Sequence, residues 1–166
     1  MLLSVIVPML FSVYTYSEID NSPRRAVVRA YTEGRPVSMI AYPIYQKDKR
    51  NKRLFLSRHA AAKFLDLVHA AARDGFHIKV VSAFRTYKEQ KCLRRMLGHK
   101  AAKPGWSNHQ LGLSVDIAGT RRTIKRKKHR TILYWWLTRN ASRFGFYNDV
   151  PEEPWHWTYK EVRDYG

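Results

Sequence analysis

Two short segments that lie far apart in the chain constrain its fold more than any other feature. The first runs from Ser107 to Asp116 and includes His109 and Gly112, and the second is Glu153-Pro154-Trp155-His156. Both segments contain imidazole and carboxylate side chains, which can bind a cation or exchange a proton near neutral pH. If these side chains act together, the fold has to bring the two segments into contact.

The spacing of the first segment limits its local structure. His109 and Asp116 are seven positions apart, so on a helix they would lie about 10 Å apart along the axis. On a flat strand the same spacing would place them on opposite faces. We therefore expect a loop that bends at Gly112 and enters a strand over residues 113–118. Alternation along this strand would turn Leu113, Val115 and Ile117 to the core and Ser114, Asp116 and Ala118 to a cleft.

The second segment also indicates extended structure. Pro154 disfavours a continuous helix, and a residue before proline, here Glu153, is shifted towards an extended conformation. In an extended segment over residues 155–159, His156 and Thr158 would share one face. Trp155, Trp157 and Tyr159 would anchor the opposite face.

Two histidines, an aspartate and a second carboxylate are the components of a hydrolytic zinc site. Such a site uses three protein ligands at roughly 2.1 Å, a fourth position for water and a carboxylate that takes the proton of that water. The single cysteine excludes an internal disulfide and a cysteine-rich structural zinc site. For the other histidines we expect ordinary surface or core positions: His59, His69, His77, His99 and His129.

The middle of the chain has clear signals for helices and strands. Apolar residues at helical spacing after Ser57 predict a helix over 58–73, followed by a strand over 76–82. Thr86 and Glu89 form a capping box, which predicts that the next helix begins at Tyr87. Further on, the apolar pattern predicts a helix over 131–144 closed by Gly145. Residues 37–45 mix apolar and polar residues, with prolines at positions 36 and 43, and favour an edge strand or an irregular loop.

The chain carries a net charge of +18, from 31 Lys and Arg against 13 Asp and Glu. Such a charge attracts polyanions, which include nucleic acid, anionic membranes and acidic wall polymers. The segment Arg121–Arg130 concentrates this charge. We interpret it as a solvated insertion loop or as a contact for a polyanion.

A chain of 166 residues is long enough for one packed domain. We expect an N-terminal arm over 1–53 and the main domain over 54–166. Residues 1–17 are apolar, but Pro8 interrupts them and the first basic residue is Arg24. This segment is interpreted as an export or anchor segment, with an N-terminal strand or packing arm as the alternative.

The two segments together resemble the paired signatures of the VanY-type D-alanyl-D-alanine carboxypeptidases. This zinc peptidase family also includes LD-carboxypeptidases and phage wall-lytic endopeptidases. Ser82-Ala83-Phe84-Arg85-Thr86 with Gln90 is similar to a third element of the family, with Phe84 and Thr86 replacing the usual Tyr and Ser. The likeness covers about residues 54–160.

The resemblance implies an α+β fold (hedgehog/DD-peptidase-like) in which helices pack on a small antiparallel sheet. A zinc ion would lie on the cleft face of that sheet, with His109, Asp116 and His156 as ligands. Glu153 would be the general base, and Arg85 would help to stabilise charge during catalysis. Arg85, Gln90 and Ser107 would hold the terminal carboxylate or the carbonyl of the substrate.

The expected substrate is a peptidoglycan stem peptide, from which the enzyme would remove the last D-alanine in the cell envelope, either in the periplasm or outside the cell. An LD-carboxypeptidase or an endopeptidase of the same fold remains an alternative, and so does a polyanion-binding protein without catalysis. Arg121–Arg130 would contact an anionic wall polymer or a membrane surface. We expect no nucleic acid partner, because no nucleic-acid-binding motif is present, and we expect a monomer.

Overall fold

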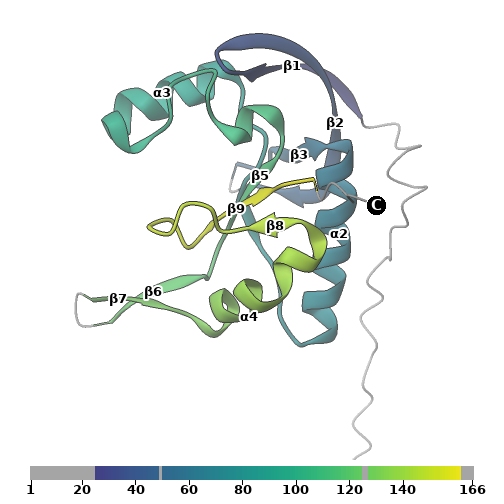
Figure 1. The fold of residues 1–166 in the computed structure, drawn as a ribbon, viewed down its shortest axis with the longest axis vertical. Coiled ribbons are helices and arrows are strands. Elements are labelled where there is room, and N and C mark those ends of the chain that lie inside the picture. The colour runs from purple at the N-terminus through teal and green to yellow at the C-terminus, as the bar shows by residue number, and fades with distance from the viewer. Residues whose placement is uncertain (1–24, 49, 125–126, 162–166) are drawn as a thin grey trace, which may run out of the picture.

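The described residues form two larger antiparallel sheets with helices packed around them and a third, two-stranded sheet, as Figure 1 shows. This is a computed structural model, and it describes residues 25–48, 50–124 and 127–161. One sheet has the order β1 (Ala26–Thr32), β2 (Arg35–Lys47), β3 (Arg53–Ser57). The other has the order β4 (Val80–Ser82), β5 (Ser114–Ile117), β9 (His156–Tyr159), β8 (Phe146–Tyr147). The predicted α+β class is confirmed.

Three α-helices are described, and their limits follow from local sequence signals. They are α2 (Arg58–Arg73), α3 (Tyr87–Leu97) and α4 (Ile132–Asn140). The predicted capping box is present, because the Thr86 hydroxyl accepts from the Glu89 N–H and the Glu89 carboxylate accepts from the Thr86 N–H. A 3₁₀ turn, η3 (Ala141–Phe144), extends α4 until Gly145 ends it at φ 76°. The helix predictions are therefore confirmed within a few residues.

One core joins the sheets and helices. Phe64 and Leu67 on α2 are fully buried, and the Phe64 ring meets Phe146 of β8 edge-on at a centroid distance of 5.6 Å. Each such side chain contributes about 2 kcal/mol through burial. Trp136 of α4 donates from its indole nitrogen to Asp74 just after α2. The core therefore fixes α2 and α4 behind the sheet that carries β5 and β9.

The N-terminal sheet belongs to this same core. Tyr42 and Ile44 of β2 are buried together with Leu56 of β3. The predicted boundary after residue 53 falls within β3, which pairs with β2 in one sheet. Residues 1–17 lie outside the described part of the chain. Every helix in the described ranges is too short or too polar to cross a membrane.

Two strand predictions need correction. Residues 37–45 belong to β2, which is the central strand of its sheet and not an edge or a loop. Its Pro43 lies where the pairing with β3 shifts register, and such an irregularity accommodates a residue without an N–H. The predicted strand over 76–82 is shortened to Val80–Ser82. The Gln46 side-chain amide donates to the Ile78 carbonyl and accepts from the Val80 N–H, so it takes the place of a neighbouring strand for these backbone groups.

The prediction of a loop at Arg121–Arg130 was wrong. Its described residues form a separate two-stranded hairpin of β6 (Arg121–Ile124) and β7 (Lys127–Arg130), which projects from the body in Figure 1. Residues 125–126 lie outside the described part. The hairpin begins after Thr120 and ends at Thr131, where a backbone hydrogen bond of 3.2 Å closes it.

The turn between β1 and β2 packs against the loop that precedes His109. Gly34 N–H donates to the Gly105 carbonyl at 3.0 Å. Gly105 has φ +94°, and a Cβ at this position would lie 2.8 Å from the Gly34 Cα. Two glycines are therefore needed where these two backbones meet.

Replacing Gly105 with alanine tests this contact. We expect Gly105→Ala to lower the free energy of unfolding by about 3 kcal/mol, because a clash adds to the unfavourable φ. The matched control is Gly75→Ala, which has φ +80° and open space around the new Cβ, so about 1 kcal/mol is expected. Urea denaturation measures both values. If the two variants lost the same free energy of unfolding, the close contact between the β1–β2 turn and the loop at Gly105 would be contradicted.

Candidate metal centre

The sheet places three polar side chains in one row. Ser82 of β4 lies opposite Asp116 of β5, and Asp116 lies opposite His156 of β9. Directly opposed residues of antiparallel strands have Cβ atoms about 5 Å apart, so their side chains meet. Val115 and Ile117 alternate to the other face and are fully buried. The predicted alternation is confirmed within β5, which is one residue shorter at each end than the predicted strand.

His109 reaches the same row from a loop. It lies in a 3₁₀ turn, η2 (Asn108–Leu111), which Gly112 ends in the left-handed conformation at φ 63°. The chain then turns into β5. Imidazole Nδ1 of His109 donates to the Ala83 carbonyl at 2.7 Å, and the Arg85 N–H donates to the His109 carbonyl at 3.1 Å. These bonds leave Nε2 of the ring turned towards Asp116 and His156.

The three candidate ligand atoms are equally spaced. Nε2 of His109 lies 3.2 Å from Nδ1 of His156 and 3.2 Å from Oδ1 of Asp116. Nδ1 of His156 lies 3.2 Å from the same Oδ1. Ligands at 2.0–2.1 Å in a tetrahedral arrangement are about 3.3 Å apart. The cluster therefore has the donor types and the spacing that a zinc ion requires, and it leaves one coordination position for water.

The environment keeps these groups in states that can bind a cation. Burial lowers the pKa of His109, so the ring is neutral and Nε2 keeps its lone pair. Burial by itself raises the pKa of a carboxyl group, but the pKa of Asp116 lies below its ordinary value, and the Arg85 guanidinium 2.6 Å from Oδ2 helps to hold it there. Asp116 is therefore a carboxylate. A neutral imidazole and an ionised carboxylate are the forms that coordinate metals.

Arg85 contacts the cluster directly. Its Nη2 lies 2.6 Å from Oδ2 of Asp116 and 3.0 Å from Nε2 of His109. Its Nε donates to the Ser82 hydroxyl at 3.0 Å. Asp116 thus turns one oxygen to the imidazoles and the other to the guanidinium. Arg85 is held at the edge of the site, where its Nη1 donates to Gln90 and keeps one further N–H.

The other two predicted substrate-binding residues occupy different positions. Gln90 is 1% exposed, accepts from Arg85 Nη1 at 3.3 Å and donates to the Ala102 carbonyl at 3.0 Å. The structure therefore places Gln90 behind Arg85, where it orients the guanidinium. Ser107 precedes η2, and within the described ranges its hydroxyl makes no hydrogen bond.

Glu153 begins a β-turn that ends at His156. The His156 N–H donates to the Glu153 carbonyl at 2.9 Å, and Pro154 occupies the second position, where its fixed φ is favoured. Such a turn brings the first and fourth Cα atoms within about 7 Å. The Glu153 side chain is partly exposed, and among described residues it makes no ion pair. The turn therefore brings the backbone of Glu153 close to that of His156.

Sequence reasoning missed the residue that fixes this turn. The Asn148 amide donates to the carbonyls of Glu153 at 2.9 Å and of His156 at 2.7 Å. Asn148 follows β8, and its position in the sequence gives no sign that its side chain reaches β9. Only the pairing of β8 with β9 could have shown it.

A hydroxyl pair supports His156 from the side away from the cluster. Nε2 of His156 lies 3.1 Å from the Thr158 hydroxyl, which lies 2.9 Å from the Ser114 hydroxyl. Oδ1 of Asp149 is farther away, at 3.8 Å from the same nitrogen. If Nε2–H donates to Thr158, the lone pair of His156 is on Nδ1 and points into the cluster.

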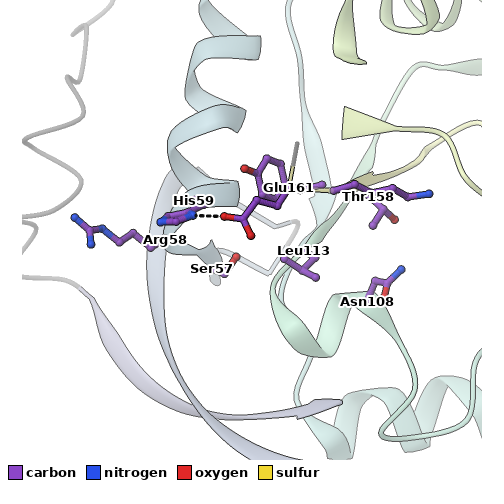
Figure 2. Close-up of a pocket in the computed structure, with 9 residues that line it drawn as sticks. Ser57, Arg58, His59, Asn108, Leu113, Thr158 and Glu161 are labelled. Carbon is purple, nitrogen blue, oxygen red and sulfur yellow. Dashed lines mark hydrogen bonds and ion pairs between the residues drawn. The ribbon is translucent and has the colours of Figure 1, made fainter. Parts of the chain in front are cut away.

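A cavity of about 590 Å³ opens next to this hydroxyl pair. Figure 2 shows His59 of α2 and Glu161 turned towards each other at this cavity, with Thr158 of β9 farther along its wall. Nδ1 of His59 lies 3.1 Å from Oε1 of Glu161. Thr158 and Asn108, the neighbours of the cluster histidines, line it as well. The cavity therefore adjoins the cluster without containing its ligand atoms.

Comparison with known proteins identifies the same region. A family model described as VanY, D-alanyl-D-alanine carboxypeptidase, matches residues 53–162. A D-alanyl-D-alanine carboxypeptidase of Enterococcus faecium is 30% identical over 118 residues, which cover 64% of this chain and 38% of that protein. The putative carboxypeptidase YodJ of Bacillus subtilis (strain 168) is 28% identical over 134 residues, 68% of this chain and 49% of that protein. The chain spans less than half the length of these curated relatives.

Solved structures agree with the fold. A mutant of the vancomycin resistance D,D-pentapeptidase VanY from a VanB-type cassette, in complex with Zn(II), is 25% identical with a TM-score of 0.56. That likeness covers 80% of this chain and 87% of the other. The LdcB LD-carboxypeptidase is also 25% identical, with a TM-score of 0.54 over 69% of this chain and 65% of its own.

Removing the Thr158 hydroxyl tests its role in orienting His156. We expect Thr158→Val to weaken Zn(II) affinity by about 10–100-fold, because Nε2–H loses its acceptor and the ring loses its orientation. Competition with a chromophoric chelator measures the affinity. Thr138→Val is the control, since that hydroxyl bonds only to the carbonyl of Tyr134 in its own helix. Unchanged affinity in Thr158→Val would contradict the role of the hydroxyl pair.

Proposed function

Because the chain belongs to the VanY family of D-alanyl-D-alanine carboxypeptidases, we propose that it is a zinc-dependent carboxypeptidase acting in the cell envelope. Its substrate would be a peptidoglycan stem peptide, from which it releases the terminal D-alanine. The observation that carries this proposal is the cluster of three ligand atoms spaced 3.2 Å apart, with Glu153 in the turn that ends at His156.

The metal ligands in this proposal are Nε2 of His109, Nδ1 of His156 and Oδ1 of Asp116. Two imidazoles and one carboxylate form a common ligand set for catalytic zinc. A zinc ion held there supplies Lewis acidity towards water and the peptide carbonyl. The Zn(II) complex of the related pentapeptidase supports the choice of metal.

Glu153 moves the proton in this proposal. Its carboxylate takes a proton from the attacking water as the new bond to the carbonyl carbon forms. It then gives this proton to the nitrogen of the departing D-alanine when the C–N bond breaks. The turn held by Asn148 keeps Glu153 close to His156 while leaving its carboxylate without a competing described partner.

Arg85 and Ser107 bind the end of the substrate in this proposal. A guanidinium offers planar N–H donors that match a carboxylate and also stabilise charge developing on the carbonyl oxygen. Ser82, Gln90 and Asp116 hold three of its nitrogens in place, so little entropy is lost on binding. The hydroxyl of Ser107, which is largely buried and has no hydrogen-bond partner among the described residues, adds a second donor.

A second candidate is an LD-carboxypeptidase of the same fold, which the likeness to LdcB favours. The chemistry would be identical, and only the configuration of the residue before the scissile bond would differ. Mass spectrometry of the fragments released from tetrapeptide and pentapeptide stems would distinguish the two activities. An endopeptidase would release fragments longer than one residue.

Glu153→Gln tests the proton transfer. We expect the rate of D-alanine release from a stem pentapeptide to fall by about 10²–10⁴-fold, since an amide cannot take a proton. Metal content measured by native mass spectrometry should stay at the wild-type level, because Glu153 is not a ligand. Glu152→Gln, one residue earlier and exposed, is the matched control. Wild-type rates in Glu153→Gln would refute the assigned role.

Arg85→Lys tests substrate binding by the guanidinium. A lysine keeps the charge but loses the planar fork and the bonds to Ser82 and Gln90. We expect kcat/KM for the pentapeptide to fall by at least about tenfold. Arg95→Lys on the exposed part of α3 should leave kcat/KM unchanged. The same steady-state values for Arg85→Lys and the wild type would exclude a direct role for Arg85.

A further inference from the structure

The hairpin formed by β6 and β7, here named the basic hairpin, has no role in the proposed reaction. Its described basic residues occupy both faces of the ribbon. Arg121 is paired with Arg130 and Thr123 with Lys128 on one face, and Arg122 is paired with His129 on the other. Arg121 and Arg130 are like charges directly opposite each other, and such a pair by itself destabilises a sheet.

The base of the basic hairpin is fixed to the segment that carries Glu153. The Arg121 guanidinium lies 4.2 Å from the ring centroid of Trp155, the residue before His156. Arg130 lies 4.7 Å from the Tyr134 ring and donates to the Pro151 carbonyl. Cation–π contacts and a backbone hydrogen bond hold these two side chains in place. The orientation of the basic hairpin is therefore tied to the candidate metal centre.

A pocket of about 230 Å³ lies between the basic hairpin and the segment that contains Glu152 and Pro154. Three permanently charged side chains line it, with one carboxylate and two other residues: Arg121, Lys128, Arg130, Glu152, His129 and Pro154. Its charge is positive by two, from three cations against one anion. Arg122, Lys127 and Lys128 make no ion pair within the described ranges. Cations that are exposed and unpaired can exchange their counterions for a polyanion.

We propose that the basic hairpin is a docking site for a linear wall polymer with phosphodiester-linked repeats, which holds the segment that carries Glu153 next to its substrate. The identity of the polymer as a wall component rests on the proposed function. Charge on both faces of a ribbon suits a flexible chain that can wrap around it. A planar membrane would contact one face only, and the pocket accommodates a phosphate group better than a flat layer.

The test uses binding of the full chain to fluorescently labelled poly(glycerol phosphate). The variant Arg122→Gln/Lys127→Gln/Lys128→Gln removes three exposed cations and retains the two arginines that fix the base. The matched control, Lys88→Gln/Lys91→Gln/Lys100→Gln, removes three exposed cations from α3 and the turn after it, at the opposite end of the molecule in Figure 1. Both variants carry the same net charge, so they separate a local site from a general charge effect.

We expect the hairpin variant to bind poly(glycerol phosphate) at least about tenfold more weakly than the wild type. The control variant should stay within about twofold. Between about 50 and 200 mM salt, the slope of log affinity against log salt should be shallower in the hairpin variant by about one for each lost contact. Equal weakening in both variants would overturn the proposal.

Two further probes establish which polyanion is bound. Vesicles containing phosphatidylglycerol and a single-stranded oligonucleotide are compared at the same phosphate concentration. If either binds as tightly as poly(glycerol phosphate) with the same dependence on the basic hairpin, the proposal of a wall polymer is wrong. Weaker binding of both supports it.

Catalysis is measured separately so that the two proposals can fail independently. Release of D-alanine from a soluble pentapeptide should be the same in the hairpin variant and the wild type. Release from isolated walls should be slower in the variant, and chemical removal of the phosphate polymer should abolish that difference. A wild-type protein that binds the polymer but releases no D-alanine would refute the proposed function and leave the docking site standing. Identical release from intact walls would refute the coupling of docking to catalysis.

Discussion

The direct pairing of Asp116 with His156 is the contact on which the candidate metal centre depends. It is set by the antiparallel register of β5 and β9, in which Val115 and Trp157 face the core behind the site. A shift of one residue would turn Asp116 into the core and Val115 into the cleft. Burial of apolar side chains on one face of the sheet therefore fixes the polar geometry on the other.

Around this pair, the protein uses short-range polar contacts to set the states of its side chains. The Ala83 carbonyl and the Thr158 hydroxyl each engage the outward nitrogen of a histidine, so both inward nitrogens are left to coordinate. Arg85 neutralises the oxygen of Asp116 that faces away from the imidazoles. A buried carboxylate without these partners would favour its protonated form. The supporting residues are thus as necessary to the centre as the ligands.

Charge is distributed unevenly between the packed body of the protein and the projecting basic hairpin. Among the described residues, the buried carboxylate of Asp116 is paired within the cluster. The excess positive charge lies on exposed elements, of which the basic hairpin is the most concentrated. Its base is attached through Arg121 and Arg130 to the segment carrying Glu153. Binding at the basic hairpin and chemistry at the cluster would therefore occur on parts of the molecule that are held together.

The sequence by itself determined the local elements and the candidate chemistry of this protein. Helical spacing marked α2, the pair Thr86 and Glu89 marked the start of α3, and alternation about Asp116 marked the inward face of β5, because these signals act between residues a few positions apart. The motifs also indicated the ligand set. Tertiary structure alone decided the central position of β2, the shortening of β4 by Gln46, and the burial of Gln90 behind Arg85. It also brought Asn148 to the turn at Glu153 and formed the basic hairpin. Each of these depends on contacts between distant segments, which no local pattern encodes.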